Sequence, residues 1–168
     1  MADQLRLYRE SKTDTQISDP FIDKKRCVDR LLREFREHGH LIIAYDYDNT
    51  VYDYHKKGYI FERVVALLRE CYSLGFHLVV FTSCNEDRLP EIGRDLTKRS
   101  IPFHAINESP EYVPFKGRKV FYNHFLDDRA GLAEAVEILE DVVVKVAAEL
   151  RANKALFKED GSPIDEIA

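Results

Sequence analysis

Apolar residues alternate along the chain between strand-like and helical patterns. The run 41–45 is continuously apolar and is bounded by polar residues, which is typical of a strand buried on both faces in a parallel sheet. Further strands are predicted at 76–81, 101–106 and 119–126, and apolar residues at helical spacing predict helices at 20–38, 61–74, 88–100 and 131–156. The alternation predicts an α/β fold, namely a doubly wound, mostly parallel sheet with helices on both faces.

Particular residues mark the ends of these helices. Asp19 followed by Pro20 predicts the start of the first helix, and Gly39 and Gly75 predict the ends of the first two. One face of the second helix is expected to carry Phe61, Val64, Val65, Leu68 and Tyr72. The last helix carries a stripe formed by Leu132, Val136, Leu139, Val143, Val146 and Leu150. That stripe predicts either the seam of a homodimer or packing on the chain's own sheet.

The length of 168 residues suits a single domain with a substantial core. Residues 1–18 are polar and lack a clear period, so we expect a loose N-terminal arm followed by one domain over 19–168. The N-terminus has no apolar segment of the signal-peptide kind, and no apolar run approaches the length that crosses a membrane. A membrane partner is therefore not expected.

Composition narrows the class of protein. Hydrophobic residues make up 45% and charged residues 33%, as in soluble globular proteins. The net charge of -5 does not indicate a broad nucleic-acid surface, although a local basic patch remains compatible with it. Cys27, Cys71 and Cys84 are odd in number and widely spaced, which favours reduced thiols in a cytoplasmic protein over disulfides.

The first strand runs directly into Asp46, Asp48 and Thr50. Open α/β sheets bind ligands at the carboxyl ends of their strands. Two acids at the tip of a buried strand lose hydration and repel each other unless a cation neutralises them. The pattern therefore favours a divalent metal with oxygen ligands and one carboxylate left for chemistry, with an Asp-rich turn as the structural alternative.

Two other predicted strands also end in polar side chains. Thr82 and Ser83 follow the second strand, and Asp127 and Asp128 follow the last. Because the ends of parallel strands lie along one edge, these groups are expected to converge with the first pair of acids. Carboxylates, a hydroxyl and a nearby lysine are the groups that phosphoryl transfer with a metal ion requires.

These motifs give the sequence a specific resemblance over about residues 40–140. It resembles the phosphatase branch of the haloacid dehalogenase (HAD) superfamily, through four motifs in the family's order. They are Ile43-Ala44-Tyr45-Asp46-Tyr47-Asp48-Asn49-Thr50-Val51, Val79-Val80-Phe81-Thr82, a lysine before the last strand, and Phe125-Leu126-Asp127-Asp128. The resemblance implies a magnesium-dependent phosphatase on a Rossmann-like sheet.

The resemblance also implies a role for each motif residue. Asp46 would be the nucleophile that forms an aspartyl-phosphate, and Asp48 the general acid and base, whose backbone carbonyl also reaches Mg²⁺. Asp128 would bind the metal directly, while Asp127 would support it or bind through water. Thr82 would bind the substrate phosphate, and Ser83 would either contact it or cap the strand end.

Two candidates remain for the motif lysine, Lys116 and Lys119, and the spacing in relatives favours Lys119. Shortly after the nucleophile, at the place where the family has a flap, the sequence carries a cluster of aromatic and basic side chains together with one acid, namely Tyr52, Asp53, Tyr54, His55, Lys56 and Lys57. They would stack on a base or hold a second phosphate, although an exposed turn explains them as well.

The lengths between the motifs leave no room for the cap domains that many relatives insert. We therefore expect an open site that accepts a bulky phosphorylated substrate, a nucleotide among them, whose identity the sequence does not give. The alternative function is a phosphoacceptor or phosphate-binding module similar to response-regulator receivers. In those proteins the paired acids come early in the chain, whereas Asp127 and Asp128 come last here.

Overall fold

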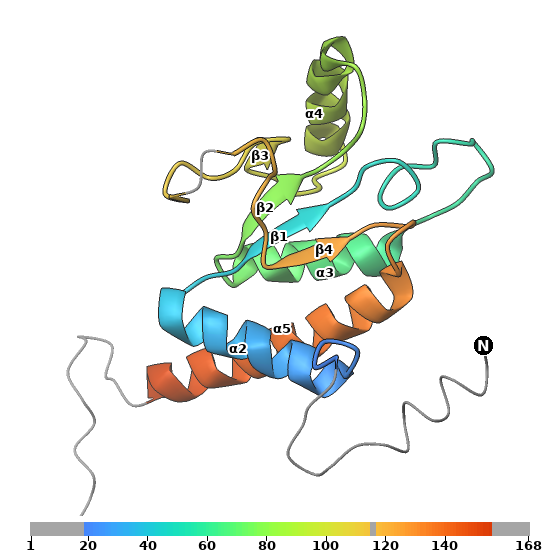
Figure 1. Ribbon diagram of the computed structural model, residues 1–168. Helices are drawn as coiled ribbons and strands as arrows, with labels where there is room; N and C mark the ends of the chain where they lie inside the picture. The colour runs from blue at the N-terminus through green and yellow to red at the C-terminus, as the bar shows by residue number, and fades with distance from the viewer. Residues whose placement is uncertain (1–18, 115–116, 156–168) are drawn as a thin grey trace, which may run out of the picture.

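The computed structural model describes residues 19–114 and 117–155. Within them, four strands form one sheet in the order β3-β2-β1-β4, and every neighbouring pair is parallel (Figure 1). The strands are β1 (Ile42–Tyr45), β2 (His77–Val80), β3 (Ala105–Ile106) and β4 (His124–Leu126). The predicted α/β class with a parallel sheet is confirmed. The expected N-terminal arm, Lys116 and Leu156 lie outside the described residues.

The register of the sheet aligns the strand ends that carry the predicted site. Tyr45, the last residue of β1, pairs with Val80 of β2 and with Leu126 of β4. The chain therefore leaves all three strands at the same level, and the polar residues that follow emerge at one edge.

The helices are α2 (Lys24–His38), α3 (Glu62–Ser73), α4 (Leu89–Lys98) and α5 (Leu132–Ala155), with a short 3₁₀ helix, η1 (Glu86–Arg88), before α4. Figure 1 shows α4 near the β3 edge of the sheet, and α2 and α5 crossing each other beyond β4. α5 packs against both α2 and α3.

The predicted start of the first helix at Asp19 is wrong by one turn. The N-cap is Asp23, whose carboxylate accepts a hydrogen bond from the backbone N–H of Arg26 at 3.1 Å. Asp19 instead opens a turn closed by a bond from the Ile22 N–H to its carbonyl at 3.0 Å. At the other end Gly39 adopts a left-handed φ of 77° and ends α2 as predicted.

The two outer strands begin later than the sequence predicts, for the same reason. The backbone N–H of Leu78 donates to Nδ1 of His104 at 2.9 Å, and that of Ile42 donates to Oδ1 of Asn123 at 2.7 Å. A side chain thus takes the place of the backbone carbonyl that would extend each ladder. The predicted strands 101–106 and 119–126 are therefore reduced to β3 and β4.

The main core lies between the helices and one face of the sheet. Ile43 and Tyr45 of β1 and Leu78 and Val80 of β2 pack there with buried residues of α2, α3, α4 and α5. The residues of β1 and β2 that alternate with these form a second cluster. In it, Ile42 and Val79 pack with Val113 and Val120 from the segment between β3 and β4.

The buried face of α3 is rotated relative to the prediction. Tyr72 is exposed over 54% of its surface, whereas Leu67 and Cys71 are buried together with Val64, Val65 and Leu68. Because α3 packs against both β2 and α5, its buried face is turned toward Leu67 and Cys71 rather than Tyr72.

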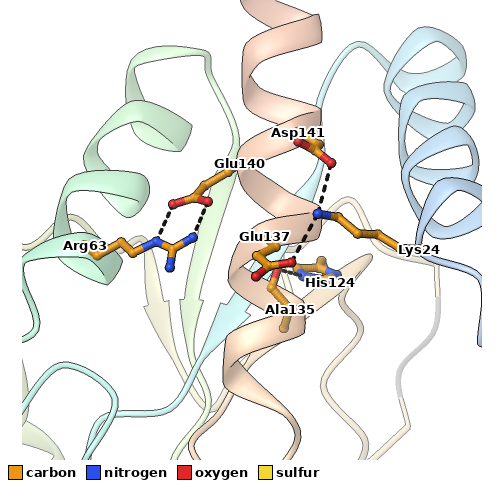
Figure 2. Close-up of polar contacts among 7 residues, drawn as sticks. All are labelled: Lys24, Arg63, His124, Ala135, Glu137, Glu140 and Asp141. Carbon is orange, nitrogen blue, oxygen red and sulfur yellow. Dashed lines mark hydrogen bonds and ion pairs between the residues drawn. The ribbon is translucent and has the colours of Figure 1, made fainter.

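The apolar stripe of α5 packs within the chain. Val136, Leu139, Val143 and Val146 are buried in the main core, so the stripe needs no second copy to cover it. The polar side of α5 is paired with its neighbours (Figure 2): Arg63 of α3 binds Glu140 at 2.7 and 2.6 Å, and Lys24 of α2 lies 3.3 Å from Glu137 and from Asp141.

No separate cap domain is present among the described residues. The segment from β1 to α3 holds turns and an isolated bridge between Asp48 and Tyr52, and β2 connects to β3 through η1 and α4. In the described part of the chain, none of the helices has the length and apolar character needed to cross a membrane.

Candidate functional site

A hollow of about 770 Å³ lies at the carboxyl ends of β1, β2 and β4. Four of the predicted acids line it, together with two predicted hydroxyls and several basic side chains. These are Asp46, Asp48, Asp127 and Asp128, Thr82 and Ser83, and His55, Arg88, Arg118 and Arg129. The sheet therefore brings together the groups that the sequence places at three separate strand ends.

Three acids stand close enough to share one cation. Asp46, Asp127 and Asp128 each present a carboxylate oxygen, and these oxygens lie within 4.8 Å of one another. The backbone N–H of Asp46 donates to the carbonyl of Leu126 at 2.9 Å, which ties the end of β1 to the residue before the paired acids. The predicted convergence of Asp46 with Asp128 is thereby confirmed.

The electrostatics of this trio favour a cation. Burial raises the pKa of Asp46 to about 6, against hydrogen bonds from the Tyr47 N–H and the Thr82 hydroxyl, which lower it. The negative charges of Asp127 and Asp48 raise it further. An all-carboxylate donor set suits hard divalent cations such as Mg²⁺, which would remove this repulsion. The residues present therefore fit the metal that the resemblance implies.

Backbone contacts fix the other two acids of the trio. The N–H of Asp128 donates to Oγ1 of Thr50 at 3.2 Å, and Thr50 is fully buried. Oδ1 of Asp127 accepts a hydrogen bond from the N–H of Arg129 at 2.7 Å. Asp128 is exposed, whereas Asp127 is half-buried.

Thr82 is held in place by the residue that directly follows β3. The backbone N–H of Thr82 donates to Oδ1 of Asn107 at 2.9 Å, and Nδ2 of Asn107 donates to the carbonyl of Thr82 at 2.8 Å. Thr82 is 6% exposed and its hydroxyl reaches Asp46. Ser83, the next residue, is exposed and lines the same hollow.

Asp48 lies in the hollow but outside the trio. Both of its carboxylate oxygens accept hydrogen bonds from the guanidinium of Arg88, at 3.0 and 3.1 Å. The guanidinium carbon also lies 5.9 Å from the ring centre of Tyr47 and 5.6 Å from that of Tyr54. A fork-shaped ion pair flanked by two aromatic rings fixes the direction of the Asp48 side chain.

Of the basic residues near the predicted motif lysine, the one that lines the hollow is not the one that the sequence favoured. Arg118 lines the hollow, whereas Lys119 is exposed and is not among the lining residues. Lys116, the other candidate, lies outside the described residues. The role of Lys119 therefore stays a prediction, and Arg118 joins the candidates for binding an anion.

Sequence reasoning missed Arg88, Asn107 and Arg118 as site residues. Arg88 stands at the predicted start of a helix and Asn107 at the start of a loop, where polar residues are ordinary. Asn107 has a left-handed φ of 56°, a conformation that asparagine tolerates better than most residues. An asparagine directly after a strand was the one local signal that could have identified it.

Comparisons with known proteins bear on the fold alone. No known family model matches the chain, and no curated protein matches it in sequence. A conserved protein from Bacteroides thetaiotaomicron is similar in structure, with 23% identity and a TM-score of 0.50 over 61% of this chain and 91% of that one. An MCSG target from Vibrio cholerae matches over 63% of this chain and 97% of that one, with 27% identity and a TM-score of 0.37. The chain is thus similar in fold to the Bacteroides protein, which is described without an activity.

Proposed function

We propose that this protein is a magnesium-dependent phosphatase of the HAD type, which hydrolyses phosphomonoesters through a phosphorylated Asp46. The observation that carries the proposal is the meeting of three carboxylates and a buried hydroxyl at one sheet edge. Asp46, Asp127 and Asp128 gather within 4.8 Å, and Thr82 donates to Asp46. The four motifs of the sequence supply the same residues in the family's order.

Asp46, Asp127 and Asp128 would hold the metal ion, with the backbone carbonyl of Asp48 as the further ligand that the resemblance implies. Mg²⁺ bound there would neutralise the acids and the phosphate, so that an anionic nucleophile could approach an anionic substrate.

The first step forms a bond between a carboxylate oxygen of Asp46 and phosphorus. The bond from phosphorus to the ester oxygen breaks, and the alcohol leaves with the electron pair and a proton from Asp48. In the second step water attacks phosphorus, Asp48 takes the water proton, and Asp46 is released as carboxylate with inorganic phosphate. Asp48 must part from Arg88 by enough to exchange that proton.

The remaining polar groups have the chemistry to hold the phosphate. The hydroxyls of Thr82 and Ser83 can donate to its non-bridging oxygens, and Arg118 supplies positive charge. Lys119 is the further cation that the resemblance implies. Because no cap domain covers the hollow among the described residues, the site is suited to a bulky phosphorylated substrate, including a nucleotide.

The test is hydrolysis of p-nitrophenyl phosphate with Mg²⁺, with and without a chelator. Asp46→Asn should abolish turnover, because an amide is a poor nucleophile. Asp29→Asn is the matched control, since Asp29 is an exposed acid that pairs with Lys25 on α2 and does not line the hollow. Equal turnover in the wild type and Asp46→Asn would refute the proposal. A phosphorylated form that persists for minutes would instead favour the phosphoacceptor alternative.

A further inference from the structure

The side chain of Tyr54 forms an aromatic wall of the hollow that contains Asp46. It is exposed over 52% of its surface, although tyrosine has a large apolar ring that folding usually covers. An exposed tyrosine in a turn needs no explanation by itself. Tyr54 differs from an ordinary exposed tyrosine in the contacts that hold its ring and its turn in place.

A series of contacts through Arg88, Tyr47 and Tyr52 links the ring of Tyr54 to the core. The rings of Tyr52 and Tyr47 stack at 4.8 Å with an angle of 10° between them. The guanidinium of Arg88 contacts the rings of both Tyr47 and Tyr54, and it donates two hydrogen bonds to the carboxylate of Asp48. Tyr47 is anchored in turn, because its hydroxyl donates to Asp95 at 2.8 Å. The ring of Tyr54 therefore packs against Arg88, which the ring of Tyr47 and the carboxylate of Asp48 hold in place in this structure.

The turn that carries Tyr54 is also held in one shape. Oδ2 of Asp53 accepts hydrogen bonds from the N–H groups of Gly58 at 2.7 Å and Tyr59 at 3.1 Å. The N–H of Tyr54 donates to the carbonyl of Tyr52 at 3.0 Å. A wall that is ordered before binding loses little conformational entropy when a ligand packs on it.

Apolar groups also line the hollow on other elements. Phe81 follows β2, Phe125 lies in β4, and their ring centres are 5.7 Å apart. Val120 lines the hollow as well. The hollow thus combines an acid trio for the phosphate with apolar and aromatic surface for the group that carries it.

We propose that Tyr54 is a specificity residue that stacks a planar aromatic ring on the leaving group of the phosphomonoester. The inference rests on the phosphatase function proposed above. The ring could come from a nucleoside, one sugar away from the phosphate, or from a simple arylalkyl alcohol. Both kinds of leaving group present a flat π face to Tyr54. Two pairs of substrates distinguish between them.

Each pair is matched in the oxygen that leaves, so that stacking is the main difference. The first compares adenosine 5′-monophosphate with ribose 5-phosphate, and the second compares 2-phenylethyl phosphate with 2-cyclohexylethyl phosphate. In at least one pair we expect kcat/KM to favour the ring-bearing substrate by about 5- to 100-fold, the range that stacking of one base on an aromatic side chain supplies. The preference should lie mainly in KM, because stacking contributes equally to substrate and transition-state binding.

Tyr54→Leu should reduce the preference to near one, whereas Tyr54→Phe should retain it. Tyr59→Leu is the matched control, because Tyr59 is on the same turn and exposed over 55% of its surface but lines a different hollow. A wild-type ratio near one in both pairs would overturn the inference, as would a preference that survives in Tyr54→Leu. Hydrolysis of p-nitrophenyl phosphate that depends on Asp46 would then leave the phosphatase proposal standing, whereas its absence would remove both.

Discussion

Asn107 and the backbone of Thr82 form a closed pair of hydrogen bonds, at 2.9 and 2.8 Å, between the ends of β2 and β3. The two bonds continue the pairing of β2 with β3 just past the point where the backbone hydrogen bonds of the two strands end. They fix the main chain of Thr82, and with it the direction in which the hydroxyl meets Asp46.

Replacing Asn107 should therefore disturb stability and site together. We expect Asn107→Ala to lower the free energy of unfolding by about 2 kcal/mol, because two hydrogen bonds are lost and alanine is strained at a left-handed φ. Urea unfolding of Asn107→Gly separates the two causes, since glycine keeps the backbone conformation without strain. If Asn107→Ala were as stable as the wild type, the bonds to Thr82 would contribute nothing.

Thr50 offers a test of how Asp128 is positioned. Thr50→Val keeps the shape of the side chain but removes the oxygen that accepts from the Asp128 N–H. We expect Mg²⁺ affinity, measured by titration calorimetry, to fall by about 5- to 10-fold, the equivalent of one hydrogen bond of about 1 kcal/mol. Thr97→Val is the control, because its hydroxyl bonds only within α4, to the carbonyl of Gly93. Unchanged affinity in Thr50→Val would contradict the prediction.

The raised pKa of Asp46 predicts a pH dependence of stability in the absence of metal. Burial raises this pKa from 3.8 to about 6, so the folded state favours the protonated carboxyl. The stability that the protonated Asp46 carboxyl contributes is fully present below pH 3.8 and is lost as the pH rises to about 6. Asp46→Asn should therefore stabilise the metal-free protein at pH 7 by about 1 kcal/mol, a value reduced for solvent screening of a half-exposed group.

Urea unfolding with a chelator at pH 4 and pH 7 measures that difference. The gain from Asp46→Asn should shrink at the lower pH, and Asp29→Asn should show no such gain at pH 7. Saturating Mg²⁺ should reverse the order of stability, because the wild type gains binding energy that the amide variant largely loses. An equal gain at both pH values would show that charge on Asp46 is not its cause.

The ion pair between Arg88 and Asp48 can be measured by a double-mutant cycle. Arg88→Lys retains the charge but cannot form two parallel hydrogen bonds or offer a planar guanidinium to the rings of Tyr47 and Tyr54. With Asp48→Asn as the second variant, we expect a coupling energy of about 1 kcal/mol in unfolding free energy. A coupling of zero would mean that the two parallel hydrogen bonds contribute nothing beyond the positive charge, which a lysine also supplies.

Much of the architecture could be predicted from local pattern. The continuous apolar run before Asp46 predicted β1, and helical spacing between Phe61 and Leu74 predicted α3, whose caps are those two residues. Such patterns succeed because burial of a strand or helix face depends on residues close in sequence. Element ends were less predictable, because capping depends on which of several polar residues reaches a backbone N–H. For α2 that residue is Asp23, four positions after the predicted Asp19.

The sequence by itself determined which acids and hydroxyls stand at strand ends, and a parallel sheet then had to bring those ends to one edge. Only the tertiary structure decided how each group is held: Asn107 binds Thr82 from 25 residues away, Arg88 binds Asp48 from 40, and Thr50 binds Asp128 from 78. It also placed Arg118, rather than Lys119, among the residues lining the hollow. The physical reason is that a hydrogen bond depends on distance and direction in space, and local periodicity carries neither for residues so far apart.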